Sequence, residues 1–402
     1  MSAAIAEFDV AIVGGGPAGQ TAAIAIAEAG FRTVLFAPET PPDHRTTALL
    51  GGSVTLLEKL GLIDAVAECG ATMHTMRLID DTGRLIRAPE VNFRCQEIGR
   101  DVFGYNIHNR DLNRILQERS LGLANLTRVS ARVEVSHVDE GSITVQTDEG
   151  ERFSAQIAVA ADGARSYLRE AAGIQLKSWS YSQSALVLDV THTRPHGGVS
   201  VEFHTKAGPF VLVPLPGNSS SIVLVEAPEI ADNLHAMDDT TLAREIERRA
   251  HSILGKFTIA SPRQIFPLSG FTADVMAQNR VALIGEAGHR FPPIGAQGLN
   301  LSFRDVGALT ECLINARRKQ GDLGGDTTLN AYIKARRIDI TTRTAGVDIM
   351  DRALLADNLP AQALRSLGLF LADRITPLRH LMMREGLAPT IGTPHMMRAE
   401  RG

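Results

Sequence analysis

A run of glycines near the N-terminus has the composition of a phosphate-binding turn. It reads Gly14-Gly15-Gly16-Pro17-Ala18-Gly19. Its first, third and sixth residues satisfy the spacing G-x-G-x-x-G, between a predicted strand over 8–13 and a predicted helix over 20–29, with a second strand over 33–36. In this context the glycines permit the turn and let a pyrophosphate approach the helix N-terminus. The motif predicts a dinucleotide site and does not by itself separate FAD from NAD.

A second glycine-containing stretch lies near residue 290. It reads Gly285-Glu286-Ala287-Gly288-His289-Arg290-Phe291-Pro292-Pro293-Ile294-Gly295-Ala296-Gln297-Gly298-Leu299-Asn300. Gly295 and Gly298 bracket a tight turn in which the backbone must approach another group closely. A helix is predicted over 299–317, and its free N–H groups and positive dipole end suit a negatively charged group.

Two further stretches lie between these. They read Asp43-His44-Arg45-Thr46-Thr47-Ala48-Leu49 and Ala158-Val159-Ala160-Ala161-Asp162-Gly163-Ala164-Arg165-Ser166. Together the four stretches resemble the motifs of the FAD-dependent aromatic hydroxylases, and residues 293–301 are most similar to the ubiquinone-biosynthesis (UbiH-type) branch. The resemblance implies an α/β fold. In that fold a Rossmann-like FAD-binding domain of the glutathione-reductase type is interrupted by an antiparallel-sheet substrate domain and followed by C-terminal helices.

The predicted strands place the substrate domain in the middle of the chain. Strand-like runs cover residues 185–191, 199–204, 209–213 and 221–226, and a hairpin is expected over residues 75–87. The expected domains are an FAD-binding domain of residues 1–70, 98–180 and 271–345, a substrate-binding sheet domain of residues 71–97 and 181–270, and a C-terminal helical segment of residues 346–402.

The resemblance also implies a set of FAD contacts in the glycine turn, at two arginines, at the Asp-Gly turn and in the loop near residue 290. The set is Gly14, Gly16, Pro17, Ala18, Gly19, Arg45, Arg110, Asp162, Gly163, Gly285, Glu286, Pro292, Gly295, Gly298, Leu299 and Asn300. For each arginine the alternative is a solvated side chain. Asp162 equally suits the N-cap of a helix starting near Arg165.

Two positions depart from the family pattern. Ala37 stands where an acidic residue would hold the adenosine ribose, and Glu39 or backbone groups and water are the alternatives for that task. If nothing replaces the lost hydrogen bond, FAD binding weakens by about 1.5–3 kcal/mol. The second departure is Glu286, where the family has an aspartate that bonds the ribityl chain. Glutamate keeps the charge but adds a methylene group, so the loop must shift or the carboxylate must fold back.

The activity that the resemblance implies is hydroxylation of a phenolic ring. NADPH or NADH reduces FAD, O2 supplies the oxygen atom, and the flavin carries the difficult chemistry. The reductant is expected to bind transiently, because the chain shows no second dinucleotide fingerprint. His289, in the glycine-containing stretch of residues 285–300 (the late loop), and His204, at the end of a predicted strand, are the candidates for a base that assists deprotonation of the phenol. A structural role is the alternative for both.

Three functions remain open. The first is hydroxylation of a polyprenylated phenol intermediate of ubiquinone biosynthesis. The second is hydroxylation of a small soluble aromatic compound. The third is a non-catalytic scaffold in a quinone-synthesis complex, which Ala37 and Glu286 would mark as a degenerate flavoprotein.

Composition limits the partners of this 402-residue chain. A net charge of −4 gives no indication of nucleic-acid binding. The widely spaced Cys69, Cys95 and Cys312 predict neither a disulfide framework nor a zinc site. Neither a signal peptide nor a membrane span is expected, which favours a cytoplasmic protein. The last 60 residues are rich in Leu, Met and Arg, which suits a packed helical pair or peripheral membrane contact.

Overall fold

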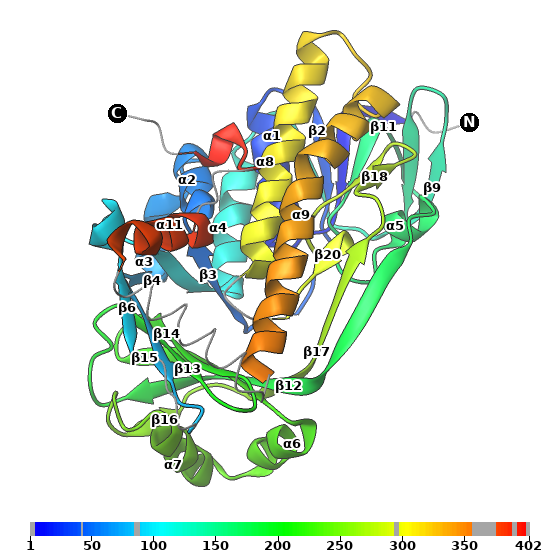
Figure 1. Cartoon of the computed structure of the whole chain (residues 1–402). Helices are drawn as coiled ribbons and strands as arrows, with labels where there is room; N and C mark the ends of the chain where they lie inside the picture. The colour runs from blue at the N-terminus through cyan, green and yellow to red at the C-terminus, as the bar shows by residue number, and fades with distance from the viewer. Residues whose placement is uncertain are drawn as a thin grey trace.

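The computed structural model describes residues 5–41, 43–83, 89–292, 297–355, 375–387 and 392–398, with the backbone alone at 297, 343–355, 378 and 386–387. Figure 1 shows a lobe of sheet and long helices joined to a second, sheet-rich lobe. Within the described ranges, none of the helices combines the length and the apolar character that a bilayer crossing requires.

The first sheet contains the N-terminal strand and follows the order β18-β19-β11-β1-β2-β8. Its strands β1, β2, β8, β11 and β19 pair in parallel, while β10 and β9 extend it in antiparallel fashion from β11. The bounds are β1 Ala6–Val13, β2 Thr33–Phe36, β8 Leu126–Val129, β9 Val133–Val138, β10 Ile143–Thr147, β11 Arg152–Ala160, β18 Ala277–Gln278 and β19 Val281–Leu283. The strands predicted over 8–13 and 33–36 are confirmed.

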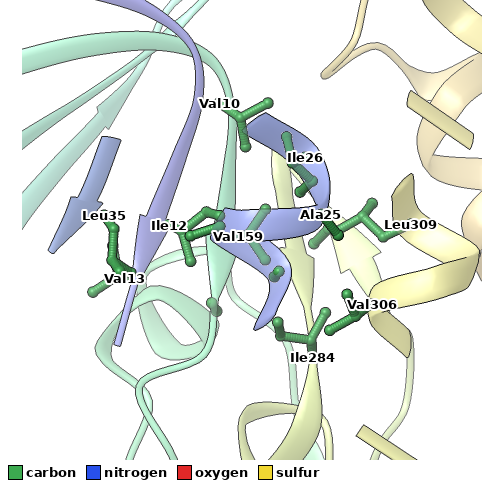
Figure 2. Packing of buried hydrophobic residues seen from close by; sticks show 14 of the residues in the cluster. Val10, Ile12, Val13, Ala25, Ile26, Leu35, Val159, Ile284, Val306 and Leu309 are labelled. Atoms are coloured by element: carbon green, nitrogen blue, oxygen red, sulfur yellow. The ribbon is translucent and has the colours of Figure 1, made fainter. Parts of the chain in front are cut away.

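Long helices cover this sheet and bury its apolar strands. Their bounds are α1 Pro17–Glu28, α4 Asn109–Leu121, α8 Gln297–Arg318 and α9 Asp326–Leu355. Figure 2 shows Ala25 of α1 beside Leu309 of α8, and Val306 beside Ile284, which follows β19. Small residues on α1 allow this close packing, and the helix predicted over 299–317 is confirmed as α8.

The second sheet forms the other lobe, in the order β20-β17-β12-β15-β14-β13-β5-β6, with β16 paired to β12. All its pairs are antiparallel except β13 with β5. The bounds are β5 Thr75–Asp80, β6 Val91–Arg94, β12 Leu176–His192, β13 Val199–His204, β14 Pro209–Leu215, β15 Ser219–Glu226, β16 Phe257–Ile259, β17 Gln264–Ala273 and β20 His289–Arg290. The four strands predicted between 185 and 226 are confirmed.

One face of the second sheet is covered by α6 and α7, at the bottom of Figure 1. Their bounds are Pro228–Ala236 and Asp239–Arg249. The buried cluster on this face includes Leu186, Leu188, Ile222, Leu224 and Phe210. Because side chains alternate along a strand, the residues between these belong to the opposite face, toward the first lobe.

A small antiparallel sheet, β3-β7-β4, packs on the core of the first lobe and contacts β14 of the second. The remaining bounds are β3 Thr46–Leu50, β4 Ala71–Met73, β7 Gly104–His108, α2 Gly52–Lys59, α3 Ile63–Cys69, α5 Tyr167–Ala171, α11 Thr376–Leu387, η1 Cys95–Ile98, η2 Gly285–Ala287 and η3 His395–Met397. Near the C-terminus, η3 packs on α2 and α8. The second strand of the hairpin expected over 75–87 lies outside the described residues. Among the described strands, β5 pairs with β6 and β13.

Candidate active site

The glycine turn predicted to bind a pyrophosphate joins β1 to α1. A Cβ atom at Gly14 would collide with the carbonyl of Ala161, and one at Gly19 with the carbonyl of Gly14, so both positions require glycine. At Gly16, in contrast, an added Cβ meets nothing within 4 Å. Gly16 is also the N-cap of α1 and provides no side-chain cap. The first N–H groups of the helix, at Ala18 and Gly19, therefore remain available to an anion.

Asp162 and Gly163 follow β11 beside this turn. The Oδ2 atom of Asp162 accepts a hydrogen bond from the Leu168 N–H at 3.3 Å. The N-cap of α5 is Ser166, whose Oγ accepts from the Arg169 N–H at 3.0 Å. The alternative prediction that Asp162 is the N-cap is therefore wrong. Asp162 Oδ1 is buried without a hydrogen-bond partner in the described part of the chain, and burial raises the pKa of this carboxyl group. The free oxygen suits a ligand hydroxyl.

Arg45 lies just before β3 in a cluster of polar side chains. Its guanidinium donates to both carboxylate oxygens of Asp43, with Nε–Oδ1 at 2.9 Å and a terminal nitrogen 2.7 Å from Oδ2. Asp43 also accepts from the Asn109 amide at 2.8 Å. The hydrogen bond with Asp43 raises the pKa of Arg45, burial opposes the rise, and the negative charges of Asp43 and Glu286 add to it. The fold thus brings Arg45 near Glu286, which lies far away in the sequence.

Arg110 lies at the start of α4 and is half exposed. Its Nε is 3.5 Å from the Asp111 carboxylate. No other ion pair of Arg110 occurs among the residues that the structure describes. This geometry is compatible with either the cofactor contact or the solvated arginine that the sequence allowed.

The late loop is held by contacts to α8 and β3. Gly285 has φ +59°, and its N–H donates to Asp305 Oδ2 at 2.9 Å, while Glu286 is exposed. The Asn300 amide donates to Ala48 O at 2.7 Å and accepts from Leu50 N at 2.9 Å, so this side chain anchors α8 to β3.

Other implied contacts of the loop vary in exposure. Pro292 is buried, Leu299 is half-buried and Gly298 is exposed, with nothing within 4 Å of an added Cβ. Gly295 lies outside the described residues.

Neither candidate base lies free at the site. His289 is buried, and its Nε2 is 2.7 Å from Asp305 Oδ2, which supports the structural alternative. His204 is half-buried, with its Nε2 2.9 Å from Glu202 Oε1 on the same strand. These two side chains point to the face of β13 opposite the α6–α7 core, so His204 remains a candidate base.

Sequence reasoning missed a buried charge network behind the late loop. Asp305 accepts from Arg336 Nε at 2.6 Å, and Arg336 also donates to Asp339 at 2.7 Å. Burial alone would raise the pKa of Asp305, but the charges of His289 and Arg336 lower it. Arg336 and Asp339 are three residues apart on α9, and this spacing of opposite charges was the available signal.

A second missed pair joins the two lobes. His108 Nε2 lies 3.0 Å from Asp189 Oδ2, across 81 residues of sequence. Next to it, Thr46 Oγ1 donates to Ser221 Oγ at 3.0 Å. Asp189 is a charged residue inside the otherwise apolar run of residues 185–190, a pattern that marks a buried polar contact. Its partner could not be read from the sequence.

The residues present fit FAD. The uncapped N-terminus of α1 suits a pyrophosphate, the free oxygen of Asp162 suits a hydroxyl group, and the start of α8 suits a negatively charged ring. Ala37, in contrast, offers no side-chain acceptor, and Glu39 is exposed.

Known proteins are similar to this chain in sequence. The family model described as an FAD binding domain matches residues 7–344. The ubiquinone hydroxylase UbiL of Rhodospirillum rubrum is 33% identical, over 98% of this chain and 92% of that protein. The 3-demethoxyubiquinol 3-hydroxylase of Escherichia coli is 29% identical, over 94% and 98%.

Solved structures agree on the fold. The p-nitrophenol 4-monooxygenase PnpA of Pseudomonas putida superposes with a TM-score of 0.77 at 20% identity, covering 99% of this chain and all of that one. PqsL of Pseudomonas aeruginosa, described as a probable FAD-dependent monooxygenase, gives 0.72 at 24% identity, over 90% and 99%. The chain therefore belongs to the family of the FAD binding domain, as an FAD-dependent monooxygenase of the aromatic hydroxylase class.

Proposed function

We propose that this chain hydroxylates a polyprenylated phenol precursor of ubiquinone, with FAD as cofactor, NADPH or NADH as reductant and O2 as co-substrate. The names of its relatives support the substrate class, since a ubiquinone hydroxylase and a 3-demethoxyubiquinol 3-hydroxylase align over nearly their whole lengths. The observation that carries the proposal is an apolar wall on the second sheet.

That wall is a row of valines in cross-strand register. Val187 of β12 pairs with Val223 of β15, which pairs with Val211 of β14, and all three are half-buried. They share a strand face with Asp189 and Ser221, which bond to the small sheet of the first lobe. The row thus faces the first lobe, where a ring and the start of an apolar tail would find apolar contacts.

The cofactor contacts form part of the proposal. When bound, FAD supplies the electron transfer and the activation of O2. The N-terminus of α1 binds the pyrophosphate, Asp162 accepts from a hydroxyl group, and the N-terminus of α8 favours negative charge on the ring. The proposed contacts within the described residues are Gly14, Gly16, Pro17, Ala18, Gly19, Arg45, Arg110, Asp162, Gly163, Gly285, Glu286, Pro292, Gly298, Leu299 and Asn300.

The proposed division of labour follows the two lobes. Residues 1–70, 98–180 and 271–345 would hold the cofactor, and residues 71–97 and 181–270 would cover the substrate. Two strands, β12 and β17, extend across these boundaries. Contacts between the lobes would exclude water from the reacting ring, which limits wasteful release of hydrogen peroxide.

The test compares two phenols that share one ring, with and without a prenyl tail. We expect the purified holoenzyme to oxidise NADPH or NADH and form hydroxylated product with the prenylated phenol at the higher kcat/KM. Val223→Thr keeps the side-chain shape but adds a hydroxyl group, so KM for the prenylated phenol should rise about fivefold, for a cost of about 1 kcal/mol. Val135→Thr, on an exposed part of β9, is the control.

Other outcomes favour the alternatives. Equal kcat/KM for both phenols, with no effect of Val223→Thr, would favour a small soluble substrate. A protein that binds no FAD and consumes no NADPH would favour the scaffold.

We also propose peripheral contact with a membrane through α11. Leu381 and Met382 of this helix are exposed, beside the basic side chain of Arg384. Exposed apolar residues next to arginine suit a lipid interface. Replacing both Leu381 and Met382 by Ser should abolish cosedimentation with anionic lipid vesicles. Unchanged cosedimentation would rule out α11 as the contact.

A further inference from the structure

The structure shows what surrounds the position of the missing acidic residue. Ala37 directly follows β2, and its N–H donates to Val129 O of β8 at 2.9 Å. Its side chain lies against the glycine turn, because a Cβ added to Gly15 would be 2.7 Å from the Cβ of Ala37. Position 37 therefore borders the turn, as a residue that contacts the adenosine half of a dinucleotide must.

An arginine leaves the neighbouring strand on the same face. Arg128 of β8 stands in register with Leu35 of β2, two residues before Ala37. Side chains in register, and those two residues apart, share one face of a sheet. Arg128 and Ala37 therefore lie on the same side of the first sheet, at neighbouring strand ends.

Arg128 is connected to the glycine turn through one buried amide. Its NH1 donates to Gln20 Oε1 at 3.2 Å. The Gln20 Nε2 donates to Gly15 O at 2.9 Å and to Asn113 Oδ1 at 3.0 Å. The amide of Gln20 thus uses both of its N–H donors and directs its oxygen at the guanidinium.

The positive charge of Arg128 is not neutralised locally. In the part of the chain that the structure describes, no ion pair of Arg128 occurs, and burial lowers the pKa of this half-buried guanidinium. A guanidinium has five N–H donors, and the contact to Gln20 uses one. A bound ligand with acceptor oxygens would stabilise such a group.

We propose that Arg128, held by Gln20, recognises the adenosine ribose of FAD in place of the absent acidic residue. A ribose hydroxyl is both a donor and an acceptor, so it can accept from a guanidinium as readily as it donates to a carboxylate. The charge at this end of the cofactor is thereby reversed, from an anion at position 37 to a cation at position 128. The inference rests on FAD being the cofactor of the proposed function.

The experiment measures the affinity of the apoprotein for three probes by calorimetry: FAD, ADP and FMN. ADP carries the adenosine half and FMN lacks it. For Arg128→Gln we expect affinity for FAD and for ADP to fall about tenfold, equivalent to about 1.4 kcal/mol, while affinity for FMN stays within about twofold. Arg128→Lys retains the charge but not the fork, and should bind FAD with intermediate affinity.

The control is Arg132→Gln, an exposed arginine four residues later, which should leave all three affinities unchanged. Equal losses for FAD and FMN would overturn the proposal, because Arg128 would then act through the fold. Unchanged FAD affinity in Arg128→Gln would overturn it as well. Failure of the wild-type protein to bind FAD would instead contradict the proposed function. None of these affinity measurements depends on hydroxylase activity.

Discussion

At the scale of single residues, Asp305 is a carboxylate in the interior of the first lobe. It is fully buried, and its charge is compensated by hydrogen bonds that it accepts from Gly285, His289 and Arg336. These contacts tie the late loop to α8 and α9. The acid therefore positions the loop without needing to touch the cofactor itself.

We expect Asp305→Asn to lower the free energy of unfolding by about 3–5 kcal/mol at pH 7, because it leaves Arg336 with less compensation in a buried site. Denaturant unfolding measures the loss. The exposed Asp139→Asn should cost about 0–1 kcal/mol and serves as control. A loss no larger than that of the control would contradict the central role of Asp305.

The pH dependence of this effect has a defined sign. The pKa of Asp305 is lowered from its ordinary value of 3.8 in the folded protein. Its contribution is therefore complete above that value and is lost as the pH falls through the folded-state pKa. The stability difference between wild type and Asp305→Asn should shrink in acid below pH 3.8, and acid unfolding curves test this. A difference that is constant with pH would show that the carboxylate charge is not responsible.

At the scale of elements, the pair β12 and β17 connects the substrate sheet to the late loop. Trp179 on β12 stands in register with Gly270 on β17, where an added Cβ would lie 2.5 Å from the indole ring. The indole N–H donates to Tyr181 Oη at 2.8 Å. The centroid of the indole ring lies 6.4 Å from that of the Phe291 ring. Glycine at position 270 thus makes room for an aromatic side chain beside the late loop.

Gly270→Ala should destabilise the protein by about 1–3 kcal/mol, because the indole must move to admit a methyl group. Trp179 is the single tryptophan of the chain, so its fluorescence reports the displacement directly. Gly141→Ala, where an added Cβ meets nothing within 4 Å, is the matched control. An unchanged emission spectrum together with unchanged stability would show that β12 and β17 accommodate the methyl group without displacing the indole.

At the scale of the whole molecule, polar side chains join two lobes that meet around the proposed site. The pair His108–Asp189 spans the junction, and both side chains are mostly buried. Contacts of this kind would hold the valine row of the second sheet against the first lobe and exclude water from the proposed site.

We expect His108→Ala to lower the fraction of consumed NADPH or NADH that yields hydroxylated product. Loss of the His108–Asp189 hydrogen bond should weaken the association of the two lobes by about 1 kcal/mol. The ratio of associated to separated lobes would then fall about fivefold. The yield of product and of hydrogen peroxide per reductant measures this. His251→Asn is the control, because His251 pairs with Asp81 at an exposed position with φ +49°, which Asn tolerates. Unchanged coupling in His108→Ala would show that this pair does not seal the site.

Much of the fold could be predicted, because its signals are local. The glycine turn, the strands around it and α8 follow from periodicity and glycine spacing. The start of α1 differed from the predicted position by three residues, since Pro17 is suited to the first turn of a helix. The sequence also allows Asp162 as the N-cap of α5, but the N-cap is Ser166, because cap geometry depends on the turn after β11.

The sequence by itself determined the phosphate-binding turn, the positions of several strands along the chain and the family, since each depends on residues close together in the chain. Only the tertiary structure decided which distant side chains meet. It paired His108 with Asp189, placed His289 in a buried network, and set Arg128 beside the turn where Ala37 offers no acceptor. Such contacts depend on strand register and helix packing, which join segments many residues apart and leave no local pattern.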